Sequence, residues 1–284
     1  MRNSVRNNFA AFSTRLEGRV PHMYLDSLGN VTIAIGNKID PLSDALGLSA
    51  SGATLKRDSD GNPASDSEIT DEWNRVKSAS GPAQLHLDQS DIDTLVANKL
   101  NDTEAALLPF FSGFADWPAD AQMGLLSLGW AMGPSKLKPP LFPIFHAAVD
   151  ARDWFGAARA CNMAGAGLVK RNAVDRGLFR NAAVSAEPPP SDPETLFLPI
   201  PGSRPQLQSG SSDVPPADDV GTLQRMFQPS RLNLLTPGSF TPGTFDTATE
   251  SAVRTFQSGE SGFPVTGVVA ELTWAALGEG VPLA

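Results

Sequence analysis

The chain has 284 residues, of which 41% are hydrophobic and 19% are charged, as in ordinary soluble globular proteins. Because this length exceeds the needs of one average domain, we expect two domains. The net charge is −9, of which residues 187–284 contribute −7, so neither part has the basic surface of a nucleic-acid binder and no nucleic acid is expected as a partner.

The sequence contains no stretch that approaches the roughly 18 apolar residues of a membrane span, and its N-terminus lacks the apolar run of a signal peptide. We therefore expect synthesis in the cytoplasm without a signal peptide, and no membrane insertion. The single cysteine, Cys161, excludes an intrachain disulfide, which suits folding in a reducing compartment. We expect the protein to be a monomer.

The first expected elements are a helix and a β-hairpin. Apolar residues at helical spacing precede a glycine that suits a helix C-terminus, namely Phe9, Phe12, Leu16 and Gly18. Strand-like stretches follow at residues 23–25 and 31–35, joined by a short turn. The helix would have Glu17 in its last turn, and the hairpin would return Thr32 to the neighbourhood of Asp26.

The middle of the chain consists of two segments that differ in amino-acid composition. Residues 41–85 are rich in Gly, Ser, Asp and Lys and look like an elaboration, with a short helix near residues 68–77. The pattern is then mostly helical from residue 89 to residue 179, with prolines that interrupt it near residue 140.

Glu17, Asp26 and Thr32 form the candidate catalytic site. Cleavage of a glycosidic bond needs an acid that protonates the leaving oxygen, and a second group that directs water or stabilises the oxocarbenium-like transition state. A glutamate at a helix end, facing a hairpin that carries an aspartate and a threonine, supplies these groups on separate rigid elements. A cleft between these elements would shield Glu17 from water.

These residues lie in the pattern Leu16-Glu-Gly-x5-Tyr24-x-Asp26-x-x-Gly29-x-x-Thr32-Ile-x-Ile-Gly36, which resembles the phage-type lysozymes of glycoside hydrolase family 24. The resemblance covers about residues 9–180 and implies a mainly α (α+β) lysozyme-like fold with two lobes and a small β-hairpin. It also implies peptidoglycan as the substrate, cut between N-acetylmuramic acid and N-acetylglucosamine without a cofactor or a metal. By this resemblance Glu17 is the general acid, Asp26 positions or activates the water, and Thr32 helps to hold it.

Two later segments extend the resemblance. The segment around Ala131 is similar to the family's central buried helix, although many members have asparagine at that position. Residues 167–179 are similar to its late helix, in which an arginine commonly pairs with the catalytic glutamate, and Arg171 is the position that would take this role. Asn37 stands where some phage members have histidine, and residues 41–85 have no counterpart in the smallest members.

A small helical core is expected in residues 217–284. Its apolar members are Leu223, Phe227, Ala252, Val253, Phe256, Trp274 and Leu277. This segment resembles the three-helix peptidoglycan-binding domain of many wall hydrolases, which implies peptidoglycan as the partner. Proline, serine and glycine dominate residues 187–216, so we expect a semi-rigid linker between this domain and a catalytic domain over residues 1–186. Such tethering would raise the local concentration of the catalytic domain on an insoluble polymer.

Other residues carry weaker signals. The run from Asp58 to Asn62 predicts a solvated polar turn rather than a calcium loop. The histidines are too scattered along the sequence to predict a metal site, standing at His22, His86 and His146. Trp117, which precedes a proline in an expected turn, is the best candidate for an exposed platform under a sugar.

The main hypothesis is an inverting muramidase that lyses the bacterial wall by water attack. One alternative is a lytic transglycosylase that needs Glu17 alone, because a substrate hydroxyl replaces water; another is a non-catalytic wall-binding protein. The presence of Asp26 and Thr32 together favours hydrolysis. A phage endolysin released by a holin, and an antibacterial effector delivered by a secretion system, both fit the expected lack of a signal peptide. Either would act in the periplasm or cell wall, and an effector would have an immunity protein that plugs the cleft.

Overall fold

The computed structural model covers the whole chain and describes it except at residues 166, 188–191, 198–203 and 279–284. The described residues are mainly helical with a small antiparallel sheet, which confirms the predicted α+β class. They form two compact units, one over Asn7–Ala106 and the other over Met1–Arg6 together with Leu107–Ala284.

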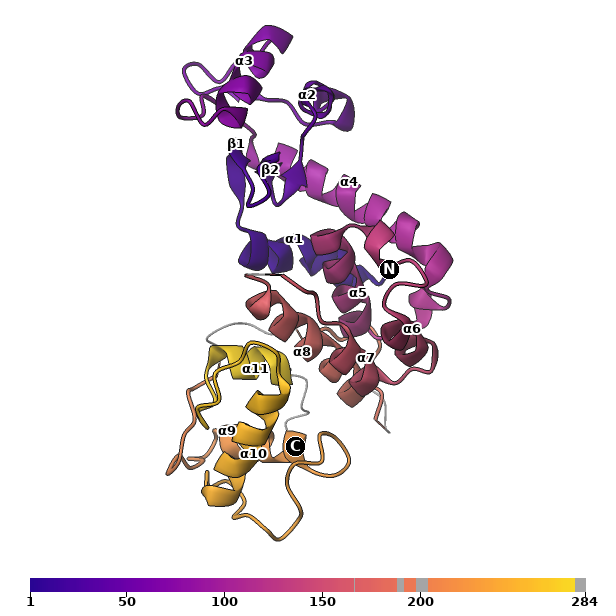
Figure 1. Ribbon diagram of the computed structural model, residues 1–284, viewed down its shortest axis with the longest axis vertical. Helices are drawn as coiled ribbons and strands as arrows, with labels where there is room; N and C mark the ends of the chain where they lie inside the picture. The colour runs from indigo at the N-terminus through magenta and orange to yellow at the C-terminus, as the bar shows by residue number, and fades with distance from the viewer. Residues whose placement is uncertain (166, 188–191, 198–203, 279–284) are drawn as a thin grey trace. The chain divides into compact units, whose positions relative to one another are not determined.

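The unit over Asn7–Ala106 contains the sheet, and two of its helices cross its boundaries. Its elements are α1 (Asn3–Glu17), β1 (Val20–Leu25), β2 (Val31–Ala34), β3 (Asn37–Lys38), α2 (Leu42–Leu46), a 3₁₀ turn (Ser49–Ser51), β4 (Lys56–Arg57), α3 (Asp66–Lys77), β5 (Leu85–His86) and α4 (Gln89–Leu107). The strands are ordered β3-β2-β1-β5-β4, so the hairpin strands β1 and β2 lie inside the sheet (Figure 1).

Strand pairing and a hydrogen-bonded turn stabilise the hairpin of β1 and β2. Tyr24 of β1 lies opposite Thr32 of β2. In the turn, Gly29 adopts a φ of +77°, which glycine tolerates without strain, and its N–H donates to the Asp26 carbonyl at 3.0 Å. The strand β1 begins at Val20, earlier than predicted, while β2 begins where it was predicted.

Residues 41–85 contribute two strands to the sheet. The predicted helix near residues 68–77 is confirmed as α3, which begins with a capping box between Ser65 and Glu68. Buried Glu72 of α3 accepts hydrogen bonds from the backbone N–H groups of Gln84 at 2.8 Å and Leu85 at 3.2 Å. These bonds fix β5, which pairs with both β1 and β4, so the insertion widens the sheet that carries the hairpin.

The other unit is helical. Its elements are the 3₁₀ turns Leu108–Phe110, Phe114–Asp116 and Pro134–Leu137, and the helices α5 (Ala119–Met132), α6 (Pro143–Asp150), α7 (Trp154–Ala160), α8 (Val169–Ser185), α9 (Asp219–Phe227), α10 (Thr247–Gly259) and α11 (Glu271–Leu277). Helix α8 contacts α5, α7 and α11, the last of which belongs to the C-terminal domain.

Helix α8 is polar and yet almost completely buried. Its enclosed polar side chains are Arg171, Asn172, Asp175, Arg176, Arg180, Asn181 and Ser185. Glu260, which follows α10, accepts hydrogen bonds from Arg176 and Arg180 at 2.5 Å each, and all three residues are at most 8% exposed. Because buried charges persist only when they are paired, the C-terminal domain supplies the countercharge that α8 requires.

The contact between α8 and α11 is also sterically close. A Cβ atom on Gly177 would lie 1.9 Å from the carbonyl oxygen of Ala275. Nearby, the Arg180 guanidinium donates to the Ala276 carbonyl and lies 4.9 Å from the centroid of the Phe256 ring. A glycine at this position of α8 is therefore what lets the backbone of α11 approach.

Part of the predicted linker packs onto this unit. The backbone N–H of Phe197 donates to the Asp120 carboxylate at 3.1 and 3.2 Å. Further along, Leu207 forms an antiparallel bridge with Val269 of the C-terminal domain. Residues 188–191 and 198–203 of the predicted linker lie outside the described residues.

We predict that Gly177→Ala separates α8 from α11 and destabilises the protein by roughly 1–3 kcal/mol, because a methyl group cannot fit against the Ala275 carbonyl. The measurement is the thermal unfolding midpoint. Gly259→Ala is the matched control, since a Cβ atom there meets no neighbouring atom within 4 Å. Equal midpoints for the two variants would contradict the proposed steric role of Gly177.

We predict that stability falls as the pH rises from about 4 to about 7. Burial raises the pKa of Asp120 to about 7, against hydrogen bonds from Phe197 and Asn181, and burial raises the pKa of Asp175 to about 6. Since an unfolded aspartate loses its proton near pH 3.8, the unfolded state binds fewer protons than the native state across this interval. The free energy of unfolding should drop by more than about 1 kcal/mol across it.

The control for this prediction is a pair of aspartate-to-asparagine variants. Asp120→Asn should flatten the pH dependence, because its amide stays neutral, whereas Asp44→Asn at an exposed position should leave the dependence unchanged. A rise in stability over the same pH range would be incompatible with protonated Asp120 in the native protein.

Candidate functional site

Three predicted site residues, Glu17, Asp26 and Thr32, lie in the unit that contains the sheet. Glu17 is half-buried and is the last residue of α1. Gly18 ends this helix with a φ of +78°, and its N–H donates to the Thr14 carbonyl at 2.9 Å. The chain then enters β1, which ends immediately before Asp26.

The charges of both carboxylates act on the hydroxyl group of Tyr24. The pKa of its hydroxyl is raised, first by burial and then by the negative charges of Glu17 and Asp26, while a hydrogen bond with the Gly36 backbone acts in the opposite direction. Both carboxylates therefore lie within electrostatic reach of one phenol. The structure thus places Glu17 and Asp26 where the charges of both act on Tyr24, a residue to which the sequence analysis assigned no role.

The carboxylate of Asp26 is held by its own turn. Its Oδ1 accepts the backbone N–H groups of Leu28 and Asn30, both at 2.8 Å, and its Oδ2 accepts the Asn30 side-chain amide at 3.0 Å. Burial raises the pKa of Asp26, but the hydrogen bonds from Asn30 and Leu28 and the charge of Lys38 outweigh it and lower the pKa. Asp26 is therefore ionised at neutral pH, which suits an electrostatic or water-orienting role rather than that of an acid.

Thr32 shares a partner with Asp26. Its side chain is 3% exposed, and its hydroxyl donates to the Asn30 carbonyl at 3.3 Å. Asn30 thus binds Asp26 through its amide and Thr32 through its carbonyl. The sequence signal for this residue was an aspartate followed by asparagine within a tight turn, a combination in which side chains commonly bond to the turn backbone.

Arg171, the fourth predicted site residue, lies in α8 and is 6% exposed. Its guanidinium donates to the Ser127 hydroxyl at 3.2 Å, and its charge lowers the pKa of Asp175, opposing the effect of burial. Because Arg171 and Glu17 belong to different compact units, the pair between them stays a prediction.

The prediction for Trp117 is wrong. This residue is 1% exposed, because its indole packs among other rings. Its centroid lies 5.1 Å from that of Trp154 and 5.5 Å from that of Phe114, and the Arg152 guanidinium lies 5.5 Å from the ring. Trp117 is therefore part of the hydrophobic core and is not an exposed ring on which a sugar could stack.

Two histidines that are distant in the sequence meet on the sheet. Pairing of β1 with β5 places His22 opposite His86, with ring centroids 6.2 Å apart. His86 bonds to Asp58 at 2.6 Å, and His22 bonds to the Leu85 carbonyl at 2.9 Å. Within the part of the chain that the structure describes, no group of three His, Cys, Asp or Glu side chains is arranged to hold a metal ion.

In the turn from Asp58 to Asn62 the carboxylate of Asp60 accepts the Asn62 N–H at 3.0 Å, as in a self-bonded polar turn.

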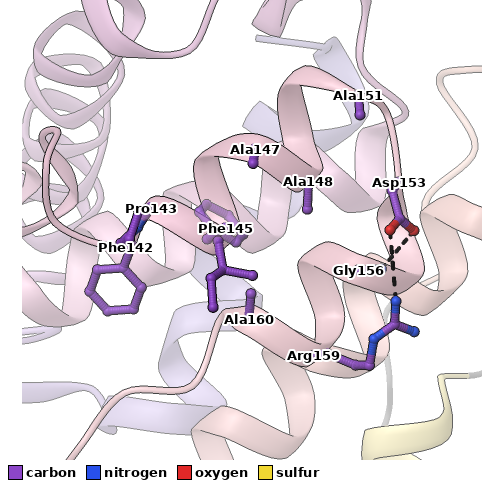
Figure 2. A pocket seen from close by; sticks show the side chains of 11 residues that line it. Phe142, Pro143, Phe145, Ala147, Ala148, Ala151, Asp153, Gly156, Arg159 and Ala160 are labelled. Atoms are coloured by element: carbon purple, nitrogen blue, oxygen red, sulfur yellow. Dashed lines mark hydrogen bonds and ion pairs between the residues drawn. The ribbon is translucent and has the colours of Figure 1, made fainter.

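A groove between α6 and α7 is open but lacks catalytic groups (Figure 2). It has a volume of about 640 Å³ and is lined mainly by apolar residues of the two helices. Asp153 is the only carboxylate among the described residues that line it, and it is already bound to the Gly156 N–H and to Arg159. This groove cannot supply the two cooperating groups that glycosidic cleavage requires.

Two buried glutamines organise the C-terminal domain. The Gln224 amide of α9 donates to the Thr244 carbonyl at 2.9 Å, which ties α9 to the loop before α10. Gln257 of α10 accepts the backbone N–H groups of Thr266 and Gly267, both at 2.9 Å, which ties α10 to the loop before α11. Asp246 caps α10 by accepting the Thr249 N–H at 2.9 Å. The predicted helical core is thereby confirmed.

A small pocket opens beside Gln257. Its volume is about 320 Å³, and its lining consists of Gln257, Phe263, Pro264, Thr266, Val268, Ala270, Leu272 and Thr273. The pocket therefore lies between the end of α10, the following loop and the start of α11.

Comparison with known proteins identifies the C-terminal domain. The model of the peptidoglycan binding domain family matches residues 216–277, a range that contains α9, α10, α11 and the pocket beside Gln257. No curated protein and no solved structure matches the chain. In the described part of the chain, none of the helices combines the length and apolar character needed to span a bilayer.

We predict that Asn30→Ala raises the pKa of Asp26 toward its ordinary value, because the variant removes the side-chain amide that donates to the carboxylate. A titration of the Asp26 carboxyl by NMR measures this directly. Asn74→Ala on α3 is the control and should leave the titration unchanged. If Asn30→Ala had no effect, the hydrogen bond from the Asn30 side chain would not be a cause of the lowered pKa of Asp26.

Proposed function

We propose that the protein is a peptidoglycan hydrolase of the muramidase class, which cleaves the β-1,4 bond between N-acetylmuramic acid and N-acetylglucosamine. The observation that carries the proposal is that half-buried Glu17, at the end of α1, and ionised Asp26, directly after β1, both act electrostatically on Tyr24. Two carboxyl groups on separate elements are what an inverting glycosidase requires: one as acid, and one to direct water.

In this mechanism each site residue has a separate role. Glu17 protonates the oxygen of the leaving sugar. Asp26, whose pKa is lowered by hydrogen bonds from Asn30 and Leu28, orients the attacking water and stabilises the positive charge that develops on the sugar ring. Thr32, on the strand opposite Tyr24, offers its hydroxyl to the same water.

The C-terminal domain supports the choice of substrate. Its match to the peptidoglycan binding domain family indicates association with the cell wall. Because this domain is acidic, attraction to anionic wall polymers cannot drive binding, and recognition must rest on shape and local contacts. We infer that the protein acts on the wall outside the cytoplasm, as a released endolysin or as a delivered effector with a cognate immunity protein.

One observation favours a second candidate function. The Asp26 carboxylate is bound by the backbone and side chain of its own turn, as a purely structural turn residue would be. If that is its whole role, Glu17 would act alone, and the protein would be a lytic transglycosylase. The two functions differ in whether the charge of Asp26 is needed.

We predict that Glu17→Gln lowers the rate of sacculus solubilisation by about 10²–10⁴-fold, because the amide keeps the shape but has no proton to give. Release of dye from labelled sacculi is the measurement. The exposed Asp71→Asn variant on α3 is the matched acid-to-amide control and should keep full activity. A fully active Glu17→Gln protein would rule out Glu17 as the acid.

We predict that Asp26→Asn also lowers the rate, by about 10²-fold or more, while the hairpin stays folded. The asparagine oxygen can still accept the Leu28 and Asn30 backbone N–H groups, so the turn keeps its backbone hydrogen bonds while the charge and the bond from the Asn30 side-chain amide are lost. Dye release and the circular dichroism spectrum are measured on the same sample. Retained activity would favour the transglycosylase and a turn-forming role for Asp26.

A further inference from the structure

The pocket beside Gln257 has the size and chemistry of a binding site for a small apolar group. Its volume of about 320 Å³ is at the lower end of the range for ligand pockets. The polar atoms of Gln257 are already used: the oxygen accepts two backbone N–H groups, and the amide donates to the Val268 carbonyl at 2.8 Å and to the Thr273 hydroxyl at 3.2 Å. What remains for a ligand is mainly the apolar surface of Phe263, Val268 and Leu272.

A cation lies against the loop that forms one wall of this pocket. Arg254 stands one helical turn before Gln257 in α10, and its guanidinium donates to the Val265 carbonyl at 3.3 Å. A Cβ atom on Gly267 would lie 2.8 Å from the Arg254 Nε, so the guanidinium touches the loop backbone. The Arg254 side chain is 47% exposed, although it also pairs with Glu250 at 2.9 Å, and it can therefore still bind a carboxylate.

We propose that this pocket binds the peptide stem of peptidoglycan at an alanine with a free carboxylate: the alanine methyl group enters the apolar pocket and Arg254 binds the carboxylate. A sugar face rich in hydroxyl groups would leave its polar edges unpaired on this lining, whereas a methyl group would not. Charge is the second argument, because Arg254 already shares its charge with Glu250 and stands in a region whose net charge is −7, so the site favours one carboxylate over a polyanion.

Two residues that adjoin the pocket lining in the sequence contact α8. A Cβ atom on Gly262, next to Phe263, would lie 2.8 Å from the Val169 side chain, and Glu271, next to Leu272, pairs with Lys170 at 3.5 Å. Residues at the start of α8 therefore support the walls of the pocket. A bound stem peptide would be held at a fixed place on the helix that also carries Arg171.

This inference rests on the wall association in the proposed function, and the experiment separates the two. The full-length protein is tested for co-sedimentation with intact sacculi and with sacculi stripped of peptides by an amidase. It is also titrated with diacetyl-lysyl-D-alanyl-D-alanine and with the same peptide ending in an amide. We expect binding to intact sacculi, a loss of at least 10-fold on stripped sacculi, and preference for the peptide with the free carboxylate.

Substitutions in and near the pocket test whether it is the site of peptide binding. Arg254→Met should weaken binding of the free carboxylate by about 10-fold without changing the weak binding of the amide. Leu272→Asn should weaken binding of both peptides. Arg225→Met and Val214→Asn, which change an arginine and an exposed apolar residue away from the pocket, are the matched controls and should bind as wild type does.

Three results would overturn the proposal. Equal binding to intact and stripped sacculi would mean that the domain reads the glycan, so that wall association survives and the pocket assignment fails. Unchanged peptide binding in both pocket variants would move the site elsewhere on the domain. Failure to bind either kind of sacculus would reject the pocket and the wall association together.

Discussion

The ion triad of Glu260 with Arg176 and Arg180 is the interaction on which the helical unit depends. Two guanidinium groups on α8 are buried, and removal of their one shared carboxylate would leave both without the ion pair that they make with Glu260. Such a loss typically costs about 3–5 kcal/mol. The buried charges of α8 are therefore paired with Glu260, a residue more than seventy positions further along the chain.

This interaction changes how the C-terminal domain is understood. A domain on a flexible tether acts by raising local concentration, and its orientation is free. Here α11 packs on α8, the close approach at Gly177 leaves no space between them, and Phe197 and Leu207 fasten the connecting chain. Binding to the wall would then also orient the helices of this unit, so orientation as well as proximity becomes part of the function.

The hairpin shows how one residue can serve both folding and chemistry. The carboxylate of Asp26 closes its turn through Leu28 and Asn30, and the same hydrogen bonds lower its pKa. Asn30 then fixes the Thr32 hydroxyl from the other side. A site built in this way needs little reorganisation when charge develops on a substrate, which is how preorganised electrostatic stabilisation works.

Local patterns predicted the hairpin, the helix that ends at Glu17, α3 and the C-terminal core, because alternation, helical spacing and capping residues act between neighbours in the sequence. The contacts that the sequence did not predict depend on pairing over long distances. His22 meets His86 only because the insertion adds β5 to the sheet, and Trp117 is buried by Trp154. The burial of the polar residues of α8 depends on Glu260, which pairs with Arg176 and Arg180 across about eighty positions of the chain.

The central claim is that Glu17, with Asp26, directs water onto the glycosidic bond. The most direct test is digestion of purified sacculi in oxygen-18 water by the wild-type protein and by Glu17→Gln, with the released muropeptides analysed by mass spectrometry. The account predicts N-acetylmuramic acid reducing ends that carry one heavy oxygen from the wild type, and almost none from the variant. Anhydro-muramic products without the label, or labelled products from both proteins, would contradict it.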